Sequence, residues 1–221
     1  MMRRRVNFGF VLGAWLACVS QGAFSQTAHK PAAGPKEAPQ DEQLYRNVAF
    51  GFHYSIPYGW VERTKEMREQ AAQTQSAAGD ANSSAAGAKR PSKSGSEVLL
   101  AVFERPPQAM GESVNSAVVI ASESTAAYPG LKKAEDYLGP LTELAASKGF
   151  KANGEPSGLT IDGREFVRAD FTKALTDRVT MYQSTLAMVA KGQIVSFTFI
   201  AGSEDEVDEL IERIGFAGHG R

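Results

Sequence analysis

Cysteine and histidine are scarce in this sequence, and that scarcity limits the chemistry the chain can perform. Its 221 residues include one cysteine, Cys18, and three histidines, His29, His53 and His219. A protein zinc site takes three or four cysteine, histidine or carboxylate ligands at suitable spacing. We therefore expect no metal site, and no sequence feature indicates a cofactor.

The chain also lacks an excess of charge of one sign and the motifs of common enzymes. It has 24 basic and 25 acidic residues, scattered along its length. Because there is no basic stripe, nucleic acid is not an expected partner. The sequence contains no Walker loop, dinucleotide-binding glycine fingerprint, HExxH or G-x-S-x-G. These absences predict a non-enzymatic protein, although residues distant in sequence could still form a catalytic site.

A long apolar run occurs only near the N-terminus. Three arginines at 3–5 precede an apolar run from Phe8 to Ala17, and Ala23-Phe24-Ser25 then places small residues where a signal peptidase reads them. This is the pattern of a secretory signal peptide, and the run is too short for a stable membrane span. We expect residues 1–25 to be removed after Ser25, which lowers the formal net charge from −1 to about −4. The mature chain, without a transmembrane segment, is then extracytoplasmic, either periplasmic or secreted.

Cys18 leaves a second possibility open. If it leaves with the signal peptide, the mature chain has no disulfide and no thiol chemistry. If the chain is instead cut before Cys18 and lipidated there, the protein is a membrane-anchored lipoprotein. Such signals usually have leucine three residues before the cysteine and a small residue two before it. Trp15 and Leu16 occupy those positions here and only Ala17 fits, so the soluble form is favoured.

Two stretches have compositions typical of disordered chain. Residues 26–40 are rich in proline and alanine without an apolar period, and 17 of the 26 residues at 71–96 are alanine, serine or glycine. We expect a disordered leash at 26–40 and a disordered loop at 71–96. The loop interrupts a single domain at residues 41–218. A short helix is expected from about Glu62 to the start of the loop.

Apolar alternation and turn residues predict several strands. An opening strand within residues 47–60 carries large apolar side chains on alternate positions, namely Phe50, Phe52, Tyr54 and Ile56. We interpret this face as core rather than as a ligand platform. Apolar runs at 97–104 and 116–122 are typical of central strands. Two hairpins are expected around the turns Asp162-Gly163 and Lys191-Gly192.

Two helices are expected among these strands. The first covers residues 132–150 and ends at Gly149, with Gly139-Pro140 bending or dividing it. The second covers 202–216 and begins with a capping box of Ser203 and Glu206. Its expected buried stripe consists of Val207, Leu210, Ile211 and Ile214. Antiparallel strands with helices laid on them indicate the α+β class.

The order of these motifs resembles the PsbP-like superfamily, which includes the photosystem II extrinsic subunit and DcrB-like bacterial envelope proteins. The stretch "FGFHYSIPYGW" is similar to the opening signature of that family, at Phe50, Gly51, Phe52, Pro57, Gly59 and Trp60. A helix ending in "KGF", an "IDGREF" hairpin, a "KGQIVSFTF" strand and a closing helix follow in the same order. The resemblance implies an α/β/α sandwich around an antiparallel sheet of about six strands. It also implies a docking or accessory role rather than a shared catalytic residue set. The stretch 71–96 departs from the family.

Five residues are the candidates for contact with a partner. Tyr58 and Trp60 lie at the turn after the opening strand, where side chains are often partly exposed. Arg164, Arg168 and Asp170 share one face of the strand after "IDG". Charges on a strand face favour a solvated surface, with a partner patch as the alternative.

These observations predict a non-enzymatic extracytoplasmic accessory protein that docks on another envelope protein. The alternative is a carrier of a small molecule or lipid, which would need an apolar cavity between the sheet and a helix. The sequence does not identify the partner, the ligand or the oligomeric state.

Overall fold

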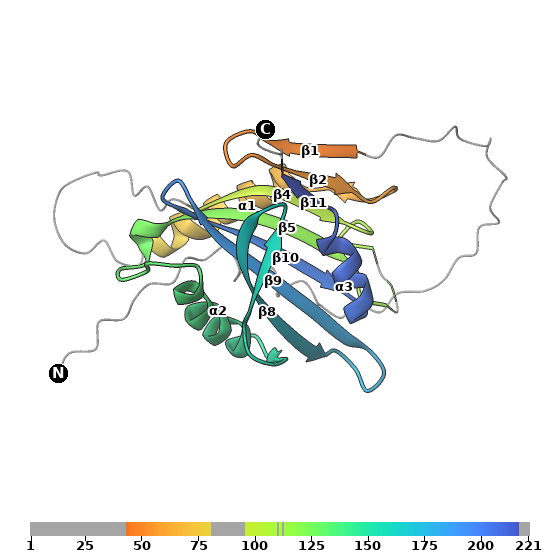
Figure 1. The fold of residues 1–221 in the computed structure, drawn as a ribbon. Coiled ribbons are helices and arrows are strands. Elements are labelled where there is room, and N and C mark those ends of the chain that lie inside the picture. The colour runs from red at the N-terminus through yellow and green to blue at the C-terminus, as the bar shows by residue number, and fades with distance from the viewer. Residues whose placement is uncertain (1–42, 81–95, 110, 112, 217–221) are drawn as a thin grey trace, which may run out of the picture.

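A computed structural model of the chain describes residues 43–80, 96–109, 111 and 113–216. The predicted signal peptide, Cys18 and the leash at 26–40 lie outside these residues. The described chain forms two antiparallel sheets with three α-helices packed on them (Figure 1). This arrangement confirms the predicted α+β class. No helix within the described ranges is long and apolar enough to cross a membrane.

The larger sheet has eight strands where about six were expected, and all its pairs are antiparallel. Two of the eight, β3 and β6, are only two residues long. The order is β3-β4-β5-β10-β9-β8-β6, with β7 also paired to β8. The strands are β3 (Val61–Glu62), β4 (Ser96–Phe103), β5 (Ala117–Ser124), β6 (Lys151–Ala152), β7 (Ser157–Ile161), β8 (Arg164–Ala174), β9 (Thr180–Ala190) and β10 (Gln193–Ala201).

Both predicted hairpins are present, and their turns explain their sequences. The backbone φ is +47° at Asp162 and +76° at Gly163, and +52° at Lys191 and +73° at Gly192. Positive φ at both central residues matches the right-handed twist of the flanking strands. The turns therefore fix the registers of β7 with β8 and of β9 with β10.

A separate three-stranded sheet is formed by β1 (Gln43–Asn47), β2 (Phe52–Ile56) and β11 (Ile214–Phe216), in the order β1-β2-β11. The predicted opening strand is shorter than expected because Asn47 starts a turn. Its carbonyl accepts from the amide of Gly51, whose φ is +75°, and its side chain accepts from the amide of Phe50.

The main core lies between this small sheet and one face of the larger sheet. Phe52, Tyr54 and Ile56 are at most 3% exposed there, which confirms the core interpretation for these three. Burying each such side chain contributes roughly 1.5–3 kcal/mol. Phe50 lies in the turn and packs against the same core while half-buried.

Two smaller clusters occupy the opposite face of the larger sheet. One lies under α2 (Glu135–Ser147), and the other includes Met67 of α1 (Thr64–Asp80). Figure 1 shows α2 and the small sheet on opposite sides of the larger sheet. α3 (Glu204–Ile211) packs beside the small sheet on β9 and β10. These are the covering layers of the predicted sandwich.

α1 also covers part of the outer edge of β4. Arg68 donates from Nε to the carbonyl of Val98 at 2.6 Å, and the Oγ1 of Thr64 accepts from the amide of Ala101 at 3.1 Å. The amide of Arg63 donates to the carbonyl of Ala101. Backbone groups at this edge are thus bonded by α1 and the residue before it rather than by a longer strand.

The expectation of a disordered loop from residue 71 is wrong for residues 71–80, because α1 continues to Asp80. Alanine and glutamine are good helix formers, and extending a helix that has already begun costs little. The expectation is also wrong for Ser96, the last residue of that stretch, which begins β4; residues 81–95 lie outside the described residues.

α2 is one continuous helix through Pro140, so of the two effects expected of Gly139-Pro140, bending or dividing the helix, division is excluded. Gly149, at φ +83°, ends it as predicted. The amides of Gly149 and Phe150 donate to the carbonyls of Ala146 and Ala145, which is a Schellman motif.

The closing helix is shorter than predicted. Ser203 caps α3 by accepting a hydrogen bond from the amide of Glu206, but the helix ends at Ile211. Ile214 and Phe216 instead pair with β2 as β11. Pairing with the otherwise unpaired side of β2 satisfies backbone groups, and it buries both side chains. These tertiary contacts override the local helix propensity.

Candidate functional site

The side chain of Arg168 lies where β8 meets α3. Its Nε donates to both carboxylate oxygens of Asp170, at 2.9 and 3.0 Å, and its Nη1 lies 2.8 Å from Oδ1 of Asp208. The side chains of Arg168 and Asp170 are 23% and 31% exposed. Burial alone would lower the pKa of Arg168, but the hydrogen bonds and charges of Asp170 and Asp208 raise it above its ordinary value. The guanidinium is therefore a permanent cation fixed by two carboxylates.

This ion-paired group borders an open hollow of about 160 Å³. The loop after β6, the middle of β8, the start of β9 and one side of α3 form its walls. The amide of Asn153 donates to the carbonyl of Asp170, and its side chain donates to Oε1 of Glu204 at 2.7 Å. The lining residues are Asn153, Arg168, Asp170, Phe171, Tyr182, Gln183, Glu204, Val207 and Asp208.

The interpretation of the β8 face as a solvated surface is wrong for its middle. Phe166 is 3% exposed and belongs to the main core, and Arg168 is bonded to α3. The sequence pattern placed these residues on one strand face but did not show that a helix covers that face. The side chains of Arg168 and Asp170 are therefore held by ion pairs with each other and with α3, and not only solvated.

Arg164, at the start of β8, is exposed and does not line the hollow. Its guanidinium carbon lies 5.9 Å from the centre of the Phe216 ring, within cation–π range. Of the three charged candidates, the structure brings together Arg168 and Asp170 and leaves Arg164 apart.

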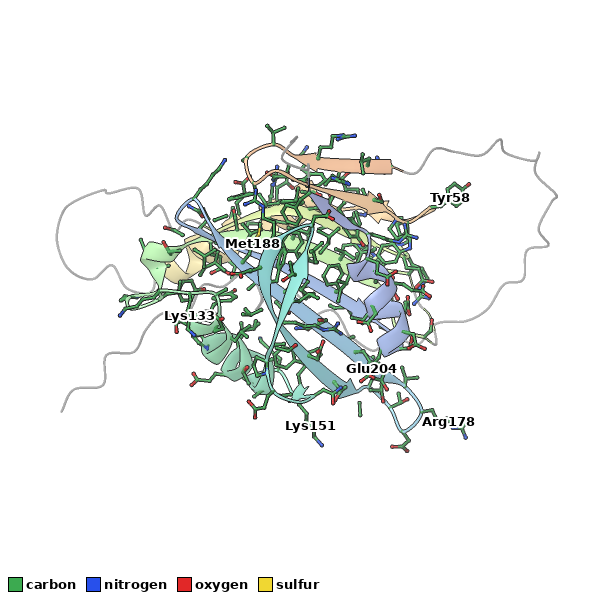
Figure 2. All side chains as sticks on the ribbon, viewed as in Figure 1. Tyr58, Lys133, Lys151, Arg178, Met188 and Glu204 are labelled. Carbon is green, nitrogen blue, oxygen red and sulfur yellow. The ribbon has the colours of Figure 1, made fainter. Side chains whose placement is uncertain are left out.

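The turn from Pro57 to Trp60 presents the other two candidates differently. The amide of Trp60 donates to the carbonyl of Pro57 at 3.2 Å, and Gly59 has φ +81°, as the third position of a type II turn requires. Tyr58, at the second position, is 63% exposed and projects away from the end of β2 (Figure 2). Trp60 is half-buried against the main core. Of these two candidates, Tyr58 is therefore the exposed one, and Trp60 anchors the turn.

Sequence reasoning missed Glu204 and Asp208 as site residues. Carboxylates in the first turns of a helix are ordinarily stabilised by the helix dipole and by solvent, so they do not mark a site by themselves. Their spacing of four residues places them on one helix face, and that face meets the strand that carries Arg168. The spacing is visible in sequence, but the packing partner is not.

A buried carboxyl group occupies the other end of the larger sheet. Glu123, at the end of β5, is 3% exposed and accepts hydrogen bonds from the hydroxyls of Tyr128 and Tyr137, the latter at 3.0 Å. Burial raises the pKa of Glu123, and the two hydrogen bonds partly oppose that rise. No Lys, Arg or His of the described chain forms an ion pair with it.

A second, larger and more open hollow of about 470 Å³ lies between the small sheet and α3. Its lining is His53, Ser55, Glu209, Glu212, Arg213, Ile214 and Gly215. Most of these side chains are polar or charged, and the same holds for the hollow at Arg168. A carrier of lipid would need an apolar enclosure, so neither hollow favours that alternative. The described ranges contain no group of three or more metal-ligating side chains.

Three solved structures illustrate what the chain is similar to. PsbP (CyanoP) of Synechocystis sp. PCC 6803 is 13% identical, with 85% of this chain and 98% of that chain covered and a TM-score of 0.47. The Ran-binding protein Mog1p of Saccharomyces cerevisiae is 8% identical, with 80% of this chain and 96% of that chain covered and a TM-score of 0.41. LpqN of Mycobacterium tuberculosis, involved in cell envelope biogenesis, is 11% identical, with 81% of this chain and 87% of that chain covered and a TM-score of 0.36.

A PsbP protein is therefore among the solved structures that this chain resembles, as its motifs predicted. No protein-family model matches the chain, and no curated protein matches its sequence. At these identities and TM-scores the likenesses concern the fold alone.

Proposed function

We propose that this protein is a non-enzymatic docking protein of the extracytoplasmic space, and that it binds another envelope protein through the end of the molecule that carries Tyr58. The observation that carries the proposal is the exposure of Tyr58 on a hydrogen-bonded turn. An aromatic side chain on a turn of fixed backbone loses little conformational freedom on binding, and tyrosine is enriched among residues that dominate interface energies.

The surroundings of Tyr58 support a binding surface at this end. Val61, just after the turn, pairs with Phe103, and Phe103 pairs with Ala117. Ser116 donates to Oε1 of Glu206 on α3 at 2.5 Å. The turn and the N-terminal part of α3 thus lie at the same end of the sheet (Figure 2), where an aromatic contact and a charged hollow are available to one partner.

The chemistry of the hollow supports recognition rather than catalysis. Its lining has no histidine, cysteine, serine or lysine. Its cation is already bonded to two carboxylates, and the lining offers no activated nucleophile.

The proposed location depends on the signal peptide, and mass spectrometry of the protein from its own host tests it. A mature chain that starts at Gln26 supports a soluble extracytoplasmic protein. A diacyl or triacyl addition on Cys18 supports a tethered one. An intact chain with residues 1–25 retained contradicts both forms of the proposal.

A photo-crosslinking amino acid at position 58 tests the docking function in the native envelope. We expect one discrete, saturable adduct at position 58. Position 48 is the matched control, because Val48 is 90% exposed but lies on a different turn. Equal adducts at both positions, or none at 58 in a correctly folded protein, would overturn the proposal.

A further inference from the structure

We propose that the hollow beside Arg168 binds the cationic head of a lysine or arginine side chain of the partner protein. This inference rests on the proposed docking function and adds the chemistry of the group that is recognised.

The charge of the lining favours a cation. Asp170, Glu204 and Asp208 contribute three carboxylates and Arg168 contributes one guanidinium, which leaves a formal charge of −2. Although Arg168 by itself would attract an anion, its Nε and Nη1 are already bonded to Asp170 and Asp208. An entering anion would meet uncompensated carboxylates, whereas an entering cation is attracted by them.

Two of these carboxylates are accessible and are oriented by neighbours. Asp208 uses Oδ1 toward Arg168, and its side chain is 56% exposed, so it can accept a further donor. Glu204 is exposed, and its Oε1 is bonded by the side chain of Asn153. Because both groups have a bonded neighbour, less conformational freedom is lost when a ligand binds.

The size and walls of the hollow fit the end of a side chain. Its 160 Å³ is below the roughly 300–1,000 Å³ of pockets that enclose whole small molecules. Tyr182, which is half-buried, lines it with apolar ring atoms. The methylene stem of a lysine or arginine can pack on such atoms while its charged head reaches the carboxylates.

A titration followed by NMR with isotope-labelled mature protein tests the inference without the partner. The probes are Nα-acetyl-lysine N-methylamide and Nα-acetyl-arginine N-methylamide, with the uncharged Nα-acetyl-norleucine N-methylamide as control. We expect saturable shifts of the amides of Asn153, Arg168–Phe171 and Glu204–Asp208 with the two basic probes. The shifts should weaken as salt is added, because the site is partly exposed.

Matched variants separate the hollow from general surface charge. Asp208→Asn and Glu204→Gln should each weaken binding of the basic probes by about fivefold, the scale of an exposed charge contact. Asp205→Asn should leave binding unchanged, because Asp205 is exposed on the same helix but does not line the hollow. The Glu204→Gln variant leaves the Arg168 ion pairs intact, so it keeps the test valid if Asp208→Asn disturbs the fold.

Three results would overturn the inference: no saturable shift with either basic probe, equal shifts with the uncharged probe, or equal weakening by Asp205→Asn. Its failure is distinguishable from failure of the docking function. An adduct at position 58 without probe binding would contradict recognition of a basic side chain but support the docking function. Probe binding without an adduct would support a cation site but contradict docking through the Tyr58 end.

Discussion

The hydroxyl of Tyr137, on α2, donates a 3.0 Å hydrogen bond to Oε1 of Glu123 at the end of β5, and both side chains are 3% exposed. Tyr128 donates to the other oxygen of the same carboxyl group, and the two tyrosine rings meet edge-on with centres 5.3 Å apart. The buried acid thus joins α2 and the segment before it to the sheet. It does so through neutral donors rather than through a cation.

We predict that Glu123 makes the protein less stable as pH rises from acid toward neutral. Burial raises the folded-state pKa of Glu123 above its ordinary value of 4.5. Between these two pKa values the folded chain holds a proton that the unfolded chain has released, so the free energy of unfolding falls with rising pH. Glu123→Gln should remove this part of the pH dependence, as measured by denaturant unfolding from pH 4 to 8. Glu143→Gln, an exposed site on α2, is the control; equal slopes for the wild type and Glu123→Gln would contradict the prediction.

Replacing Arg168 should destabilise the fold. Arg168→Leu leaves Asp170 and Asp208 without their shared cation, and we expect a loss of about 1–2 kcal/mol, moderated by the partial exposure of all three groups. Arg178→Leu, in the exposed loop before β9, should change stability by less than about 0.5 kcal/mol. Urea unfolding of both variants gives the comparison, and similar losses would show that the ion pairs contribute nothing specific.

The two aromatic residues of the Pro57–Trp60 turn should separate into different roles. Trp60→Ala removes a half-buried ring from the main core and should cost about 1–3 kcal/mol. Tyr58→Ala should change the free energy of unfolding by less than about 0.5 kcal/mol, because that side chain is 63% exposed. Thermal unfolding distinguishes them. A loss for Tyr58→Ala as large as for Trp60→Ala would make Tyr58 structural and weaken its role as a contact.

Asp162 should be sensitive to alanine and tolerant of asparagine. Its Oδ2 accepts from the amide of Phe216 at 2.9 Å, and its own φ is +47°. Alanine loses both the hydrogen bond and the tolerance for left-handed backbone, so we expect a loss of about 1–2 kcal/mol. Asparagine retains both and should stay within about 0.5 kcal/mol of the parent. Equal losses for the two variants would assign the effect to charge rather than to this geometry.

Local chemistry made some elements predictable. The Asp162-Gly163 and Lys191-Gly192 turns, the Ser203 cap and the Gly149 stop each depend on residues within a few positions of one another. These features lie where the sequence predicted them because tight turns and helix ends accept few residue types.

Features that depend on distant contacts were not predictable in the same way. Ile214 joins β2 instead of continuing the helix because one side of that strand is otherwise unpaired. The two segments are far apart in sequence: Arg213 and Ser55, which are hydrogen-bonded here, are separated by 158 residues. The same limit applies to the hollow. Arg168 and Asp170 were candidates from the strand pattern. Only the structure shows that α3, which packs on β9 and β10, brings Asp208 to Arg168.

The contact of Arg68 and Thr64 with β4 has a consequence for self-association. An edge strand with unbonded backbone groups can pair with the same edge of another copy and begin an aggregate. Here a guanidinium and a hydroxyl bond those groups within one molecule. The two-residue strand β3 bonds the adjoining stretch of β4 at Val102 and Phe103. At this edge a helix and a short strand of the same chain, rather than a neighbouring copy, complete the sheet.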